Sequence, residues 1–233
     1  MGITEDHYAR RKVNAWIRMR RAVRDARSFT PLSSFAQCAE DVIIQTLVGT
    51  NPGRYVDVGS GHPIRGSNTY ALYEQGWSGL LVDPLRSNIE LSRHVRPRDV
   101  AIEGLCSSTN EHAIEFFEYE IYQYSTASPE QVNELAQRGH RARDSYQLPS
   151  FSLKTLVHDS KMQDARVLSI DVEGMELEVL QGNDWQVFRP TLIVVEEWTP
   201  PLSSPTPIYE FLSDIGYQFV SFNLASSFYL ASP

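Results

Sequence analysis

The stretch YVDVGSGHPIRGSNTYALYEQGWSGLLVDP, residues 55–84, contains the pattern that decides the fold. A short, mostly apolar strand over residues 54–59 runs into glycines, and a helix follows over residues 67–76. A second apolar strand covers residues 78–84. Two buried strands separated by a helix are typical of a parallel βαβ unit. The sequence therefore predicts a parallel sheet.

Strands and helices keep alternating on both sides of this unit. We expect helices at Ala39–Val48, Ser87–His94, Ser128–Arg138, Met175–Leu180 and Pro207–Ile215, a short helix after Ser152, and further strands at residues 99–106, 111–119, 165–174, 190–198, 217–222 and 226–232. This alternation predicts an open α/β sheet with helices on both faces. The last two strands have no helix between them, which predicts an antiparallel hairpin on one edge of the sheet.

The composition limits the class of protein. Of the 233 residues, 42% are hydrophobic and 21% are charged, which is enough apolar material for a core and gives no sign of general disorder. No apolar run approaches the roughly 18 residues that cross a bilayer, and the N-terminus lacks a secretory signal pattern. The two cysteines, Cys38 and Cys106, form no CxxC pair, as in proteins of a reducing compartment. We therefore expect a cytoplasmic protein.

Charge is unevenly distributed along the chain. Residues 1–30 contain eight Arg or Lys residues and three acidic ones, although the whole chain has a net charge of -8. The acidic remainder, residues 31–233, disfavours nucleic acid as a partner, because phosphate binding needs a basic surface. Residues 5–27 read as a helix, so we expect a basic N-terminal arm. The arm could be a solvated helix face or a partly ordered tail. It could also form a homodimer, cover the active site or contact an anionic membrane surface, and the sequence leaves these alternatives open.

Acidic residues and glycines follow the expected strands, at the sheet edge where open α/β proteins bind ligands. Asp57, Gly59 and Gly61 lie at the end of the first strand, where glycines let a ligand approach the backbone. Asp83 ends the second strand, where a carboxylate can bond ribose hydroxyls. Ile64 occupies a position where the dinucleotide motif has a small residue. This departure favours an adenosyl cofactor without pyrophosphate over NAD, with a dehydrogenase as the alternative.

Three segments together resemble one known family. They are SFAQCAEDVII (34–44), the stretch at 55–84, and VLSIDVEGMELEVLQGNDWQVFRPTLIVVE (167–196), with weaker support from YSTASPEQVNELAQRG (124–139). In this order they resemble the FkbM-type methyltransferases, and the third segment is the most specific. Ala39 departs from the glycine that the family often has in the first segment.

The resemblance implies a Rossmann-like class I methyltransferase fold, with a mostly parallel seven-stranded sheet and S-adenosylmethionine as cofactor. It implies that the methionine part of the cofactor lies against the first strand end and its ribose against Asp83, with the segment around Gln37 folding over it. The expected cofactor-binding residues are Gln37, Glu40, Asp57, Gly59, Ser60, Gly61, Asn68, Asp83, Cys106 and Asp171.

Methyl transfer to a hydroxyl needs alignment and a proton acceptor or a metal ion, because a hydroxyl is a poor nucleophile. Asp171, Glu173, Glu196 and Glu197 cluster at the ends of two later strands. We predict either Glu173 as general base, or Asp171 and Glu196 as ligands of Mg²⁺ or a similar hard cation. His62 is a further catalytic candidate, although a lone histidine at such a place is more often a structural donor.

The irregular stretch at residues 119–150 is predicted to be a substrate lid, since long loops in compact domains often bind ligands. Tyr122, Tyr124 and His140 in this stretch are expected to contact the acceptor, together with Glu197. Tyrosines suit stacking on sugar rings, which favours a carbohydrate acceptor.

The expected activity is O-methylation of a hydroxyl on a sugar, a glycolipid or a related glycosylated natural product. A polyketide or peptide natural product is an alternative acceptor, and a non-catalytic module that binds S-adenosylmethionine is an alternative of another class. Glu176 and Glu178 are assigned to an exposed helix surface, with no part in the chemistry.

Overall fold

The computed structural model describes residues 33–49, 51–201 and 204–232. The arm predicted at residues 1–30, with its helix at 5–27, therefore lies outside the described residues. Among the described residues, no helix combines the length and the apolar character needed to cross a membrane.

Two sheets organise the described part of the chain. The larger sheet consists of β1 (Arg54–Val58), β2 (Ser78–Asp83), β3 (Val100–Glu103), β7 (Val167–Ile170), β8 (Leu192–Glu196), β9 (Tyr217–Asn223) and β10 (Ser226–Ala231). The smaller sheet consists of β4 (Leu105–Ser107), β5 (Glu111–Glu118) and β6 (Asp144–Ser152). The helices are α2 (Glu40–Val48), α3 (Tyr70–Glu74), α4 (Arg86–Val95), α5 (Pro129–Gln137), α6 (Leu153–Asp159), α7 (Glu176–Gln181) and α8 (Pro207–Asp214), with a 3-10 turn at Tyr122–Tyr124.

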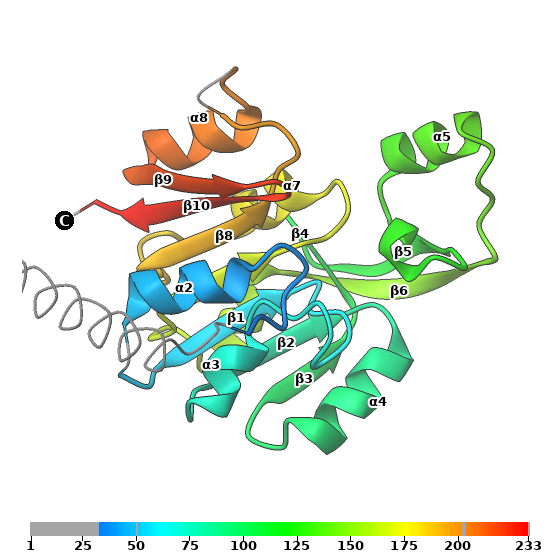
Figure 1. Ribbon diagram of the computed structural model, residues 1–233. Helices are drawn as coiled ribbons and strands as arrows, with labels where there is room; N and C mark the ends of the chain where they lie inside the picture. The colour runs from blue at the N-terminus through cyan, green and yellow to red at the C-terminus, as the bar shows by residue number, and fades with distance from the viewer. Residues whose placement is uncertain (1–32, 50, 202–203, 233) are drawn as a thin grey trace, which may run out of the picture. The chain divides into compact units, whose positions relative to one another are not determined.

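The strand order of the larger sheet is β3-β2-β1-β7-β8-β10-β9 (Figure 1). Neighbours from β3 to β8 are parallel, whereas β10 is antiparallel to both β8 and β9. The predicted fold class is confirmed: a seven-stranded, mostly parallel α/β sheet with an antiparallel C-terminal hairpin at one edge.

The prediction of a single strand at residues 99–106 is wrong. One strand ends before Gly104, and the chain then enters the other sheet. Val100–Glu103 pairs with β2, while Leu105–Ser107 pairs with β6 in parallel. The Gly104 backbone has φ 156°, and its N–H donates to the carbonyl of Asp83 at 3.1 Å. A Cβ at this position would lie 2.8 Å from the Phe151 ring. The close packing at the turn therefore requires glycine.

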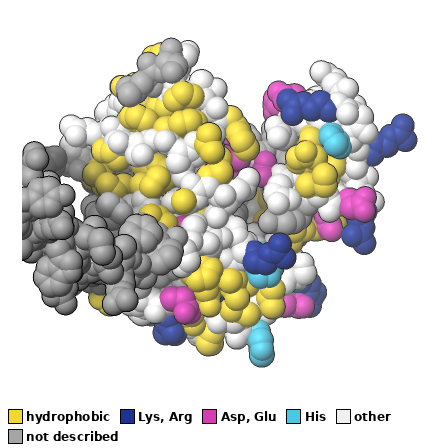
Figure 2. All heavy atoms as spheres, in the orientation of Figure 1, with side chains coloured by type: hydrophobic (Ala, Val, Ile, Leu, Met, Phe, Trp, Pro, Cys, Tyr) yellow, Lys and Arg dark blue, Asp and Glu magenta, His cyan; other side chains and the backbone are white. Residues whose placement is uncertain are grey.

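The stretch at residues 119–150 is more regular than the sequence indicates. Residues from Asp144 onward form β6, the central strand of the smaller sheet, and α5 begins at Pro129 as expected. Figure 1 shows this sheet and α5 extending away from the larger sheet. Figure 2 shows acidic side chains inside the hollow between this extension and the body of the domain.

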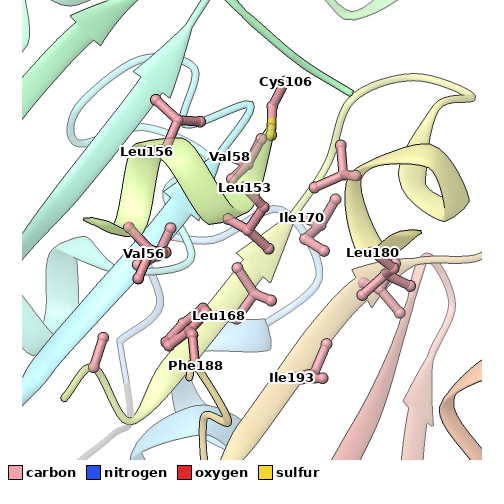
Figure 3. Packing of buried hydrophobic residues seen from close by; sticks show 14 of the residues in the cluster. Val56, Val58, Cys106, Leu153, Leu156, Leu168, Ile170, Leu180, Phe188 and Ile193 are labelled. Atoms are coloured by element: carbon pink, nitrogen blue, oxygen red, sulfur yellow. The ribbon is translucent and has the colours of Figure 1, made fainter. Parts of the chain in front are cut away.

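Helices on both faces of the larger sheet enclose two apolar cores. On one face, α6, α7 and α8 cover the buried side chains of Val56, Leu168 and Ile193. Figure 3 shows Leu153 and Leu156 of α6 in this core. On the other face, α2, α3 and α4 cover a second cluster that includes Leu81 and Val194. Successive strand residues point to opposite faces, so short apolar strands fill both cores and the strand ends remain free to form a site.

Candidate functional site

A cavity of about 740 Å³ lies at the carboxyl ends of β1, β2, β7 and β8. Its other wall comes from residues after β5 and from α5, including Tyr124, Gln131 and Leu135. This position is where open α/β sheets bind their ligands. A volume of this size falls within the range of small-molecule sites, about 300–1,000 Å³.

The turn after β1 brings the backbone to the floor of the cavity. Gly59 has φ 76°, and a Cβ there would lie only 1.6 Å from the carbonyl oxygen of Asp171. The two strand ends are tied together because the Asp171 N–H donates to the carbonyl of Val58 at 2.9 Å. Only glycine fits at this point, and its bare backbone leaves room for a ligand.

Ser60 follows in the same turn and carries a buried hydroxyl. Its Oγ has no hydrogen-bond partner among the described residues, although the residue lines the cavity. A buried polar atom without a partner costs about 1–3 kcal/mol. A polar ligand atom in the cavity would relieve that cost, so the wall fits a bound cofactor.

Asp83 lies at the tip of β2 and lines the cavity. One carboxylate oxygen accepts from the Leu85 N–H at 2.9 Å and from Asn88 Nδ2 at 3.0 Å, and the other accepts from the Gly61 N–H at 2.7 Å. Burial raises the pKa of this carboxyl to about 6, although the three donors act in the opposite direction. Asp83 thus fixes the glycine turn and still presents acceptor oxygens towards the cavity.

Three carboxylates form an acidic trio, Asp171, Glu173 and Glu196, at the ends of β7 and β8. One oxygen from each lies within 4.8 Å of the others, and all three residues line the cavity. Desolvation together with the repulsion between neighbours raises the pKa of Asp171 to about 7, that of Glu173 to about 8 and that of Glu196 to about 10. A side-chain hydrogen bond joins Asp171 and Glu196, so a proton shared between them relieves the repulsion.

The loop that presents Glu173 is strained and held from two sides. Glu173 itself has φ 55°, an uncommon conformation for a residue with a Cβ. Its carbonyl accepts from Thr126 Oγ1 at 2.9 Å, and Glu176 Oε1 accepts from the Val172 and Gly174 N–H groups, both at 3.1 Å. The expectation that Glu176 lies on the helix surface is therefore wrong: it is buried and braces the loop. Glu178 is exposed, as expected.

The structure gathers many of the predicted site residues around one cavity. Those that line it are Gln37, Gly59, Ser60, Gly61, His62, Asp83, Cys106, Tyr124, Asp171, Glu173 and Glu196. Trp198, which the sequence analysis did not single out, also lines it and is 67% exposed. A tryptophan directly after two strand-end acids, Glu196 and Glu197, is the sequence signal that could have identified it. Tyr122 lies in the 3-10 turn beside the cavity residue Gln123.

Of the predicted residues whose side chains are described, five lie outside the cavity lining, where they bind or pack against neighbouring residues. Glu40 accepts from the Cys38 N–H at 2.8 Å, Asp57 accepts from Thr69 Oγ1, and Asn68 donates to Ser169 Oγ at 3.1 Å. His140 packs edge-on against Tyr124, with ring centroids 5.0 Å apart. Glu197 accepts from the Tyr229 hydroxyl at 2.7 Å and from Thr206 Oγ1. Both Glu197 oxygens thus bind protein groups away from the expected contact with the acceptor.

Sequence reasoning missed a buried arginine behind the glycine turn. Arg96 is fully buried and pairs with Asp99 at 2.7 Å. Its guanidinium also donates to Tyr55, Thr69 and Ser67 at 2.8–3.2 Å. Because Thr69 in turn donates to Asp57, one cation neutralises the acids beneath the turn and fixes the segment that follows it.

Comparison with known proteins identifies the family. Residues 48–219 match the family described as Methyltransferase FkbM domain. The chain belongs to the FkbM methyltransferase family. The cofactor of these methyltransferases is S-adenosylmethionine, and the β1 turn, Ser60 and Asp83 provide a wall that fits it. The resemblance inferred from the three sequence segments is thereby confirmed.

Solved structures are similar to this FkbM-family chain only at low sequence identity. Methyltransferase FkbM from Methylobacillus flagellatus KT is 13% identical with a TM-score of 0.45, over 77% of this chain and 43% of that one. A TehB-like SAM-dependent methyltransferase from Corynebacterium glutamicum is 10% identical with a TM-score of 0.45, over 98% and 100% of the two chains. Precorrin-6y C5,15-methyltransferase from Geobacter metallireducens GS-15 is 15% identical with a TM-score of 0.44, over 88% and 95%.

The FkbM-family chain thus spans less than half the length of the FkbM structure from Methylobacillus flagellatus. No curated protein matches it significantly.

Proposed function

We propose that this chain transfers the methyl group of S-adenosylmethionine to a hydroxyl group of a sugar, a glycolipid or a related glycosylated natural product. The observation that carries the proposal is the acidic trio, which places three carboxylates with raised pKa values in the cavity beside the glycine turn. A hydroxyl acceptor has to lose a proton during methyl transfer, and a carboxylate in this environment can take it.

We assign the role of general base to Glu173. Asp171 and Glu196 are joined by a side-chain hydrogen bond, which leaves the carboxylate of Glu173 as the member of the trio free to take the proton. In the transfer, the hydroxyl oxygen forms the new bond to the methyl carbon as the carbon–sulfur bond breaks. The hydroxyl proton passes to Glu173, and the sulfur leaves as a neutral thioether. S-adenosylmethionine supplies the electrophilic methyl group, and the protein supplies alignment and the proton acceptor.

The acceptor class is supported by the wall that faces the trio. Tyr124 and Trp198 offer aromatic surface at the cavity, and Gln123 and Gln131 offer amide donors and acceptors. Aromatic faces beside amides suit a ring that carries several hydroxyl groups. A polyketide or peptide natural product with a free hydroxyl would use the same acids and is the alternative acceptor.

A divalent cation such as Mg²⁺ is a second candidate at the trio, because its three carboxylate oxygens are the ligand type that hard cations prefer. In that case the ion would polarise the acceptor oxygen and lower the need for a base. Glu173 would then be a ligand, and the activity would require the metal.

The test measures release of S-adenosylhomocysteine by the purified protein with sugar, glycolipid and polyketide acceptors, each with Mg²⁺ and with a chelator. We expect turnover with a carbohydrate acceptor, and a loss of about 10²–10⁴-fold in kcat for Glu173→Gln. Glu178→Gln, which changes an exposed glutamate outside the cavity, is the matched control. Activity that disappears with the chelator supports the metal alternative. Tight cofactor binding without turnover on any acceptor supports the non-catalytic module.

A further inference from the structure

His62 lies directly after the glycine turn, and its ring is fixed by the backbone of its own loop. Its Nδ1 atom accepts from the N–H of Ile64 and from the N–H of Arg65, both at 3.1 Å. A ring nitrogen that accepts hydrogen bonds carries a lone pair and no proton. The ring proton therefore sits on Nε2, and the loop geometry sets the tautomer of this histidine.

The Nε2 atom remains available to a ligand. His62 is half-buried and lines the cavity, and no partner for Nε2 is found among the described residues. The loop is also held from outside: Arg96 donates to the Pro63 carbonyl at 3.3 Å, and the Gly66 N–H donates to the Phe35 carbonyl at 2.7 Å. A donor with a fixed direction thus lies beside the β1 turn.

The order of the strands shows which part of the cofactor passes His62. Asp83, the acid suited to ribose, is on β2, and the acidic trio is on β7 and β8, with β1 between them. A nucleoside held at β2 would extend its amino-acid part across the β1 turn towards β7. The carboxylate of that part would be disfavoured next to the acidic trio and would find donors on the β1 side, where His62 and Arg65 line the cavity.

We infer that His62 donates an Nε2–H hydrogen bond to the carboxylate of the cofactor's methionine part, and that it is a binding residue and not the base of the reaction. This inference rests on the proposed use of S-adenosylmethionine. It removes His62 from the candidate bases and leaves proton transfer to the acidic trio.

Two ligands and two variants test the assignment. S-adenosylhomocysteine carries the carboxylate, whereas 5′-methylthioadenosine has the same nucleoside thioether without it. Asn in place of His62 keeps an oxygen that can accept from the loop N–H groups but lacks the distal donor. Gln in place of His62 provides a distal N–H but cannot cap the loop in the same way.

We expect His62→Asn to weaken binding of S-adenosylhomocysteine about tenfold or more in calorimetric titration, with binding of 5′-methylthioadenosine unchanged. His62→Gln should bind S-adenosylhomocysteine within a few-fold of the wild type while melting at a lower temperature. Equal weakening of both ligands by His62→Asn would show a loop effect alone and overturn the inference, as would unchanged binding of both.

The tautomer can be observed without any ligand. In the ¹⁵N-histidine-labelled protein, long-range ¹H–¹⁵N correlation should show His62 with its proton on Nε2, assigned by the signal that disappears in His62→Asn. A proton on Nδ1 would refute the geometry. Failure of the wild type to bind either ligand, with the Nε2–H tautomer present, would instead reject the proposed cofactor, so the two failures are distinguishable.

Discussion

At the scale of single residues, the glycine turn shows how closely two strand ends approach each other. Gly59 and Gly61 both have positive φ, but their surroundings differ. A Cβ at Gly59 would overlap the Asp171 carbonyl, while a Cβ at Gly61 would meet nothing within 4 Å. An alanine at Gly61 would therefore introduce backbone strain alone, whereas an alanine at Gly59 would add steric overlap to it.

Gly59→Ala should lower the free energy of unfolding by on the order of 4 kcal/mol, since strain and overlap with a backbone atom add together. Gly61→Ala should cost only about 1–2 kcal/mol, the cost of the left-handed backbone. Urea denaturation of both variants measures the difference. Similar losses for the two variants would contradict the close approach of β1 and β7.

The acids of the site could be predicted from the sequence, but the residues that hold their loops in place could not. Asp83, Asp171, Glu173 and Glu196 could be placed together because parallel strands end at the same sheet edge. Glu176 was missed because helical spacing does not reveal that a side chain turns back to bond the preceding loop. Nor does sequence spacing bring Arg96 beneath the turn, since its partners come from three separate segments.

At the scale of elements, helix α5 provides one wall of the cavity and depends on its first turn. Ser128 accepts from the Gln131 N–H at 3.3 Å, and Pro129 occupies the first turn. Ser152 has the same capping role for α6, where its Oγ accepts from the Thr155 N–H at 3.3 Å. Of these two helices, α5 contributes described residues to the cavity lining and α6 contributes none.

Ser128→Ala should cost about 1 kcal/mol through loss of the cap and should increase hydrogen exchange in residues 129–137. Because α5 supplies Gln131 and Glu134 to the cavity, acceptor KM should rise while cofactor binding stays unchanged. Ser152→Ala is the matched control, with a similar loss of stability and no change in KM. An equal effect on KM from both variants would show that α5 has no special part in the site.

The central strands of the larger sheet, β1, β2, β7 and β8, could be predicted from sequence because they are apolar and buried on both faces. The smaller sheet was predicted only in part: the strand at residues 111–119 was expected, but the strand that pairs with it was not. Its central strand, DSYQLPSFS, is largely polar and contains Pro149, and proline inside a strand normally indicates an edge strand of a sheet. Likewise the apolar run at residues 99–106 looks continuous, since the change of sheet depends on a single glycine.

At the scale of the whole molecule, the acidic trio links stability to pH. The raised pKa values of Asp171, Glu173 and Glu196 exceed those of an unfolded chain, which lie near 4. The folded protein therefore binds more protons than the unfolded chain from about pH 4 to about pH 10. Across that window these groups make the free energy of unfolding decrease as pH rises.

Glu196→Gln should flatten this pH dependence, because it removes one carboxyl that stays protonated in the folded protein while the unfolded chain ionises it. Compared with the wild type, the variant should gain melting temperature at pH 9 and change little at pH 5. Differential scanning calorimetry at several pH values measures this. Glu178→Gln should follow the wild type, and an unchanged slope in Glu196→Gln would mean that the trio is not desolvated.

The pairing of β4 with β6 has a consequence for how acceptor preference can change. Leu105–Ser107 leaves the larger sheet beside Ser150–Ser152, which leads back to it through α6. Residues 108–149 thus form an excursion whose entry and exit are clamped side by side by backbone hydrogen bonds. If Thr126, which holds the Glu173 carbonyl, is kept, such an excursion can be exchanged, lengthened or recombined while the turn after β1 keeps its geometry, which makes it the natural place to engineer or diversify the choice of acceptor.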